Sequence, residues 1–295
     1  MELFDEPPSG PYISDLKPGM RLDGALFAVV DVKPVNAKGF EFVKVRLSDS
    51  SGSVDGIVTP YSDDKVDQLR GADVVAIWGD VDSRERYAGQ VNVRSFSPQE
   101  FYDETRFVQP LPANHDAVIQ RFFDVAATIA DAPYRTLLDC VLTHMPEYFT
   151  ACAAMRIHHA YRGGLVTHST EVAEVCLAAS QIFPALDRSL LITGALLHDV
   201  GKVREMEHGL RRGKYAVHGE LVGHVVSGAL LVRDFAGAAG LADVDADRLM
   251  HLILSHHARL DQGSPREPKT AEAWVLAMAD SMSANVARCA TEGAK

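Results

Sequence analysis

The sequence predicts a two-domain chain with both α and β structure: a small five-stranded β-barrel followed by an all-α bundle. Residues 12–98 contain short segments in which apolar and polar residues alternate, whereas residues 115–295 contain longer segments with apolar residues at helical spacing. Between them, residues 99–114 include Pro110 and Pro112 and read as a linker. A length of 295 residues with 47% hydrophobic and 23% charged positions is sufficient for two separate cores.

The first domain follows a leader rich in proline and glycine, residues 1–11, and is expected to contain five strands. A short helix from Asp63 to Leu69 separates the third strand from the fourth. Five strands with a helix at that point are typical of an OB-fold barrel. The predicted strands are Arg21 to Lys33, Phe40 to Leu47, Ser53 to Val58, Asp73 to Val81 and Gln90 to Phe96.

The second predicted strand carries a candidate binding surface. Alternation turns Val43, Val45 and Leu47 toward the barrel interior. Aromatic rings stack on bases and cations contact phosphates, so the opposite face is a candidate surface for single-stranded nucleic acid. The alternative is that the aromatic rings cover a neighbouring domain while the cations remain in solvent. The residues of this face are Phe40, Phe42, Lys44 and Arg46.

The second domain is predicted to be helical throughout. Its segments have apolar residues at the spacing of an amphipathic helix, and no strand pattern interrupts them. Helical bundles commonly hold metals with side chains from facing helices. The predicted helices are Ala117 to Ile129, Tyr134 to Met145, Val166 to Ile182, Ser189 to Leu197, Glu220 to Phe235, Asp245 to Leu254 and Ala271 to Val286.

Histidines and aspartates end or interrupt several of these helices. The apolar run that ends at Leu197 is followed directly by His198 and Asp199. Burying an unpaired carboxylate is costly, so Asp199 requires a cation, and the adjacent imidazole makes a divalent metal the natural candidate. A single histidine in such a place is usually a core residue, but the joint set favours a metal site. That set is His168, His198, Asp199, His224, His256 and Asp280.

The order and local sequence of these residues resemble a known family. His168, His198-Asp199 and Asp280 resemble the metal-binding residues of HD-domain phosphohydrolases, and the added His224 and His256 match the members that hold two metals. The segments HHAYRGGL (158–165), GALLHDVGK (194–202), ILSHHA (253–258) and GSP (263–265) look like those of the YhaM-type 3′→5′ exoribonucleases. This resemblance spans roughly residues 115–288.

The resemblance implies an HD domain with two divalent cations. His168, His198, Asp199 and Asp280 would hold the first, and Asp199 would bridge to a second held also by His224 and His256. His257 is a less certain ligand, because adjacent helical residues point about 100° apart. Mixed histidine and carboxylate ligation suits Mn²⁺, Fe²⁺ or Co²⁺ better than Mg²⁺, and the resemblance favours manganese. Asp199 and Lys202 are the predicted catalytic residues, with the Lys202 ammonium offered to a phosphate oxygen or to the leaving group.

Candidate substrate contacts lie in two segments near the predicted site. His158, His159, Tyr161 and Arg162 come shortly before His168, so their loop is expected at the mouth of the metal site. The densest basic stretch follows Lys202, and a solvated loop without a role explains it equally well. That stretch contains Arg204, Arg211, Arg212 and Lys214.

Three classes of function remain open. The first is a 3′→5′ exoribonuclease that hydrolyses single-stranded RNA, with DNA undecided, to nucleoside 5′-monophosphates. The second is a phosphohydrolase of a small nucleotide, either a dNTP or a cyclic dinucleotide, although no Gly-Tyr-Pro follows the His-Asp pair. The third is a non-catalytic RNA-binding protein, against which the complete ligand set argues. A diiron oxygenase on the same scaffold is a remote fourth.

Charge and composition limit these classes. A net charge of −11 argues against a general nucleic-acid binder, but two divalent cations attract phosphate by themselves. Modest, metal-dependent affinity is therefore expected. The start of the chain lacks a signal peptide, no apolar run reaches the roughly 20 residues of a membrane span, and four isolated cysteines suggest reduced thiols. We expect a cytoplasmic protein without a membrane partner, and self-association stays open.

Overall fold

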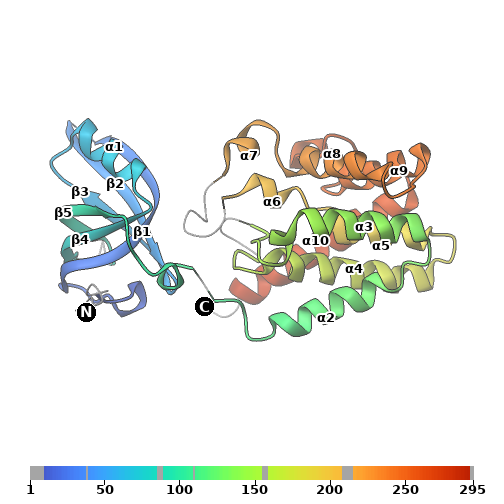
Figure 1. Cartoon of the computed structure of the whole chain (residues 1–295), viewed down its shortest axis with the longest axis horizontal. Helices are drawn as coiled ribbons and strands as arrows, with labels where there is room; N and C mark the ends of the chain where they lie inside the picture. The colour runs from blue at the N-terminus through green and yellow to red at the C-terminus, as the bar shows by residue number, and fades with distance from the viewer. Residues whose placement is uncertain are drawn as a thin grey trace, which may run out of the picture. The chain divides into compact units, whose positions relative to one another are not determined.

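The computed structural model describes residues 10–37, 39–84, 89–108, 110–154, 159–207 and 215–292. These residues divide into two compact units (Figure 1). The first takes the described residues up to Pro110 together with Glu207, and the second begins at Leu111. No helix in the described part of the chain is long and apolar enough to cross a membrane.

The first unit is a closed barrel of five strands. Its strand order is β1-β2-β3-β5-β4, and β4 pairs back with β1. Every pairing is antiparallel except that of β3 with β5, and helix α1 (Asp63–Gly71) connects β3 to β4. The predicted OB-fold barrel is therefore confirmed. The strands are β1 (Arg21–Ala37), β2 (Phe40–Asp49), β3 (Gly52–Val58), β4 (Val74–Val81) and β5 (Val91–Gln99).

The barrel interior follows the predicted alternation, but β1 is longer than expected. Val43, Val45 and Leu47 are fully buried and pack with other apolar side chains from the remaining strands. The prediction that β1 ends at Lys33 was wrong, because residues 33–37 continue the antiparallel ladder with residues 40–44 of β2. This segment, Lys-Pro-Val-Asn-Ala, contains a proline and no regular alternation of apolar and polar residues, so its strand structure comes from pairing with the neighbouring strand.

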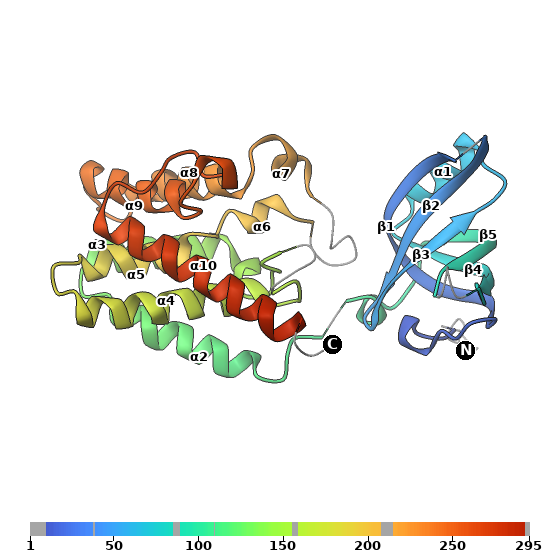
Figure 2. The same ribbon diagram turned by 180° about the vertical axis from the view of Figure 1, so that it is seen from behind.

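The second unit is a helical bundle around one apolar core. All predicted helical segments are present, but the segment predicted from Glu220 to Phe235 is two helices, separated at Gly223 with a φ of 74°. Figure 2 shows α10 crossing the front of this unit. The helices are α2 (His115–Ala126), α3 (Ala132–His144), α4 (Gly164–Ile182), α5 (Arg188–Leu197), α6 (Lys202–Glu205), α7 (Val217–Leu221), α8 (His224–Ala236), α9 (Asp243–Ser255) and α10 (Ala271–Glu292).

Candidate metal centre

The predicted ligands come together from five helices. His168 lies in the second turn of α4, His198 ends α5 with Asp199 directly after it, and Asp280 lies inside α10. The break at Gly223 makes His224 the first residue of α8, and His256 follows the last residue of α9. A histidine at a helix end can point along the helix axis into the centre of the bundle, which explains why so many ligands occupy such ends.

Asp199 lies between two groups of histidines. Its Oδ2 is 3.6 Å from His168 Nε2 and 3.4 Å from His198 Nε2. Its Oδ1 is 3.6 Å from Nε2 of both His224 and His256. The two oxygens of one carboxylate therefore face different sets of imidazoles, as a carboxylate does when it bridges two cations.

Asp280 completes the first group, which also contains His168 and His198. Its Oδ1 is 3.0 Å from His168 Nε2 and 3.9 Å from His198 Nε2. His168, His198 and Asp280 place one potential ligand atom each within 4.8 Å of the others, and so do His198, Asp199 and His256. Asp199, His168 and His198 are almost completely buried.

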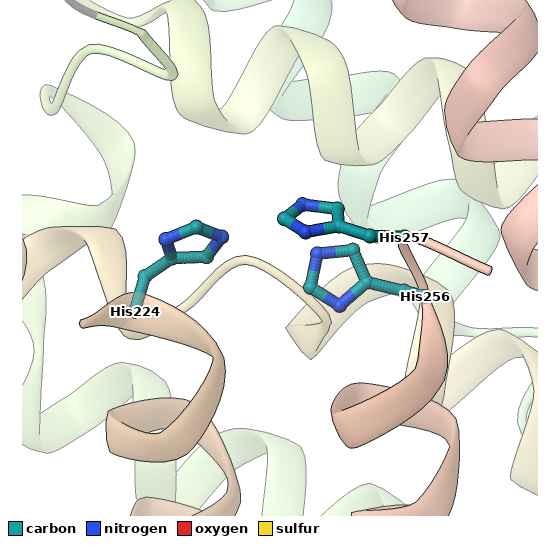
Figure 3. A group of neighbouring side chains, drawn as sticks. All are labelled: His224, His256 and His257. Atoms are coloured by element: carbon teal, nitrogen blue, oxygen red, sulfur yellow. The ribbon is translucent and has the colours of Figure 1, made fainter. Parts of the chain in front are cut away.

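The second group contains His257, which the sequence had ranked as less certain. His224, His256 and His257 also place one potential ligand atom each within 4.8 Å of the others. Figure 3 shows the rings of His256 and His257 directed toward His224, and the centroids of the two neighbouring rings are 4.1 Å apart. The divergence of adjacent residues in a continuous helix does not apply here, because α9 ends at Ser255.

Hydrogen bonds fix the tautomers of His198, His256 and His224. Nδ1 of His198 donates to the Ala195 carbonyl at 2.8 Å, and Nδ1 of His256 donates to the Ile253 carbonyl at 2.7 Å, since a carbonyl can only accept. Nδ1 of His224 donates likewise to the Glu205 carboxylate at 2.8 Å. In the neutral state, each Nε2 therefore presents a lone pair to the centre of the cluster.

His168 is held by a relay that the sequence analysis missed. The Ser283 hydroxyl donates to Glu171 Oε2 at 2.7 Å, because a carboxylate can only accept. The same hydroxyl oxygen must then accept the Nδ1 hydrogen of His168, which is 3.0 Å away. The only sequence signal was a spacing of three residues, Glu171 after His168 and Ser283 after Asp280, which puts each pair on one helix face.

The unsatisfied atoms of the cluster show that a cation fits. Among the residues that the structure describes, Asp199 Oδ1 and Nε2 of both His224 and His256 are buried without a hydrogen-bond partner. Their separations of 3.6 Å exceed a hydrogen bond, but they suit two bonds of about 2.1 Å that meet at a metal ion. With the His168 proton on Nδ1, the 3.0 Å approach of its Nε2 to Asp280 also brings two acceptors together. A divalent cation relieves each of these contacts.

The pKa shifts of Asp199 and His256 favour their deprotonated, metal-binding forms, whereas that of His198 favours protonation. Burial raises the pKa of Asp199, but Lys202, His198 and His224 outweigh burial and hold this pKa well below its usual range. Burial together with His257 and His198 keeps the pKa of His256 well below its usual value. Burial also lowers the pKa of His198, but Asp199 and Asp280 outweigh it, so this pKa is raised. At His198, therefore, a proton competes with the binding of a metal.

Lys202 lies beside the cluster, as predicted. Its Nζ is 2.6 Å from Asp199 Oδ2, and its side chain is mostly buried. The close approach of helices here depends on Gly201, because a Cβ at that position would lie 2.0 Å from the His224 carbonyl oxygen.

The predicted substrate contacts have different environments. His159 is buried, with Nε2 3.3 Å from Glu171 Oε2 and Nδ1 3.3 Å from the Tyr161 hydroxyl, so it belongs to the relay behind His168. Tyr161 and Arg162 are half-buried in the turn before α4. His158, Arg211, Arg212 and Lys214 lie outside the described residues.

The predicted face of β2 is formed, and its cations have a partner. Phe40 is 59% exposed, and its ring centroid is 6.2 Å from that of Phe42. Lys44 and Arg46 both pair with Asp55 of β3, at 2.9 and 3.0 Å. A phosphate at this face must therefore compete with a carboxylate.

Comparisons with known proteins agree with this site. Residues 165–285 match the family model described as HD domain. The chain is also similar to the crystal structure of the HD domain of the L. monocytogenes phosphodiesterase PgpH, with 18% identity over 51% of this chain and 73% of that chain. The TM-score of that match is 0.32. The helical unit of this chain thus contains an HD domain, and its histidine and aspartate clusters are consistent with the binding of divalent metal.

Proposed function

We propose that this chain is a 3′→5′ exoribonuclease that hydrolyses single-stranded RNA to nucleoside 5′-monophosphates. The observation that carries the proposal is the combination, in one chain, of an HD-type metal centre and an OB-fold barrel with an aromatic and cationic strand face. The first supplies hydrolysis of a phosphate ester, and the second suits single strands. The polarity follows from the resemblance to YhaM-type enzymes.

The centre is proposed to hold two divalent cations, with manganese favoured over iron or cobalt. When bound, they supply Lewis acidity to the phosphate and to the attacking water. Asp199 joins the two groups, because each of its oxygens faces a different set of histidines. The first position belongs to His168, His198, Asp199 and Asp280, and the second to Asp199, His224, His256 and His257.

The protein residues orient the ligands and supply charge during the reaction. Hydrolysis joins a water oxygen to the phosphorus of the terminal nucleotide and breaks the bond from that phosphorus to O3′ of the preceding one. The O3′ leaving group gains a proton. Lys202 keeps Asp199 charged from 2.6 Å, and an ammonium has three N–H donors, so it can also contact a phosphate oxygen or the leaving O3′.

The face of β2 is proposed to bind the RNA strand weakly. Phe40 and Phe42 offer rings for stacking, which works for any base and suits an enzyme without sequence preference. Because Asp55 already pairs with Lys44 and Arg46, phosphate contacts there add little affinity. Weak binding at this face would let the strand advance after each cleavage.

The same ion pairs favour one alternative, hydrolysis of a small nucleotide. If Asp55 neutralises Lys44 and Arg46 permanently, the barrel has little attraction for a polyanion, and the net charge of −11 opposes RNA further. The substrate would then be a dNTP or a cyclic dinucleotide that reaches the metal centre without the barrel.

Incubation of a single-stranded RNA labelled at its 5′ end with the protein and Mn²⁺ decides between the two. We expect a ladder that shortens from the 3′ end, no cleavage with EDTA, and no cleavage by the Asp199→Ala variant. Asp243→Ala is the matched control, because this aspartate of α9 is 91% exposed and lies outside the cluster. Intact RNA together with hydrolysis of a dNTP or a cyclic dinucleotide would select the alternative and contradict the exoribonuclease proposal.

A further inference from the structure

The outer face of α10 carries an apolar stripe that the metal centre does not use. Trp274, Met278, Met282 and Val286 follow one another at intervals of four residues and are 51, 53, 47 and 64% exposed. Figure 2 shows α10 at the front of the helical unit, with no other element of that unit in front of it. The buried side of the same helix carries Asp280 and Ser283, so the stripe and the metal centre lie on opposite faces.

This face is uncharged although the chain as a whole is strongly charged. No exposed residue of α10 from Ala271 to Val286 is ionisable, in a chain with 23% charged residues. The polar groups on the face are satisfied inside the helix, because Asn285 Nδ2 donates to the carbonyl and the hydroxyl of Ser281 at 2.7 and 3.2 Å. Burying the residues from Ala271 to Val286 therefore desolvates no exposed charge of their own and leaves few polar groups unpaired. The Arg288 guanidinium, which donates to Asn285 Oδ1 at 2.9 Å, lies at the C-terminal edge of the face.

We propose that a second copy of this chain covers the stripe, with the two α10 helices packed antiparallel across a twofold axis. The four residues are spaced evenly about position 280. An antiparallel partner therefore places Met278 opposite Met282 of the second copy, and Trp274 opposite its Val286. Rows of residues four apart are the ridges that interlock when two helices cross at about −50°.

Charge and area both support a second copy as the occupant. Two chains of net charge −11 repel each other, and a face without exposed ionisable residues adds no local repulsion to that between the whole chains. The exposed parts of the four side chains total roughly 400 Å², about half of the ~800 Å² that each partner buries in a stable interface. The stripe then forms the apolar centre of the contact, and residues on both sides form its rim.

Complementary charges test the proposed pairing. Full-length protein is measured by light scattering during size exclusion at micromolar concentration. We expect a dimer for the native chain and a dimer dissociation constant raised about tenfold or more by Met278→Lys or by Met282→Glu. An equimolar mixture of the two variants should dimerise again, because the introduced ammonium and carboxylate face each other across the axis. Ile182→Lys, at a 70% exposed apolar residue of α4, is the control and should remain dimeric.

Cross-linking tests the geometry separately. In a Cys289→Ser background, Ser281→Cys lies beside the twofold axis and should form a covalent dimer under mild oxidation, whereas Gln181→Cys on α4 should not. Unchanged circular dichroism of each variant excludes misfolding, since all these positions are exposed. A monomeric native chain, a dimer that survives both charged substitutions, or a mixture that does not dimerise again would overturn the proposal. None of these outcomes depends on the substrate of the metal centre.

Discussion

Removal of the Ser283 hydroxyl is expected to weaken metal binding without weakening the fold. The hydroxyl accepts the Nδ1 hydrogen of His168 at 3.0 Å and donates to Glu171 at 2.7 Å, which leaves the His168 Nε2 lone pair for a metal. In Ser283→Ala, the proton moves to Nε2, where Asp280 Oδ1 lies 3.0 Å away and accepts it. The metal then has to displace a hydrogen-bonded proton.

The expected loss of metal affinity follows from the free energy of the hydrogen bond that held the His168 proton on Nδ1. One buried hydrogen bond is worth about 1–2 kcal/mol, which corresponds to about a 5- to 30-fold weaker metal affinity. Substitutions of residues that hydrogen-bond to metal ligands lower metal affinity by about 10- to 100-fold. In the metal-free variant, the new bond to Asp280 replaces the old one to Ser283. The bond from Ser283 to Glu171 is lost, but the Glu171 side chain is 37% exposed and can be hydrated, so the loss of stability is small. The effect therefore appears in metal affinity and not in the unfolding of the metal-free protein.

Two measurements test this reasoning. Competition with a fluorescent chelator gives the Mn²⁺ affinity, and the ¹⁵N shifts of the His168 ring report which nitrogen carries the proton. Ser283→Thr keeps a hydroxyl and should restore both values, while Ser281→Ala, on the exposed face of the same helix, should change neither. Native affinity in Ser283→Ala, with the His168 proton still on Nδ1, would refute the relay.

Three further predictions follow from the same structure. Metal affinity should fall as the pH decreases from 8 to 6, because Asp199 and Asp280 raise the pKa of His198 and a protonated imidazole cannot bind a metal. Calorimetry in buffers of different ionisation enthalpy should show that protons are released when the metal binds. Removal of metal by EDTA should lower the melting temperature, by an amount equivalent to about 2.7 kcal/mol if metal is present at 100 times its dissociation constant, and Mn²⁺ should restore it. The double substitution Phe40→Ala, Phe42→Ala should weaken RNA binding by about 1–3 kcal/mol per lost stacking contact and leave hydrolysis of a small phosphodiester unchanged. Phe101→Ala, at an 85% exposed residue, is the control and should change neither RNA binding nor hydrolysis.

The spacing of apolar residues predicted secondary structure correctly where one side of a strand or helix is buried, because burial requires apolar residues on that side. The alternation of Val43, Val45 and Leu47 predicted the interior of β2, and helical spacing predicted the helices of the second unit. Periodicity misled where a neighbour decides the backbone. The end of β1 from Lys33 to Ala37 is a strand because β2 pairs with it, and Gly223 separates two helices that the apolar spacing had joined.

The sequence by itself determined the two kinds of domain and the identity of most candidate ligands, because both depend on residue type and local spacing. Only the tertiary structure decided that the two oxygens of Asp199 face different histidines, that His257 joins His224, and that a relay behind His168 holds its tautomer. Those facts depend on helix ends and on side chains more than a hundred residues apart. Local spacing does not encode such contacts; the packing of the core creates them.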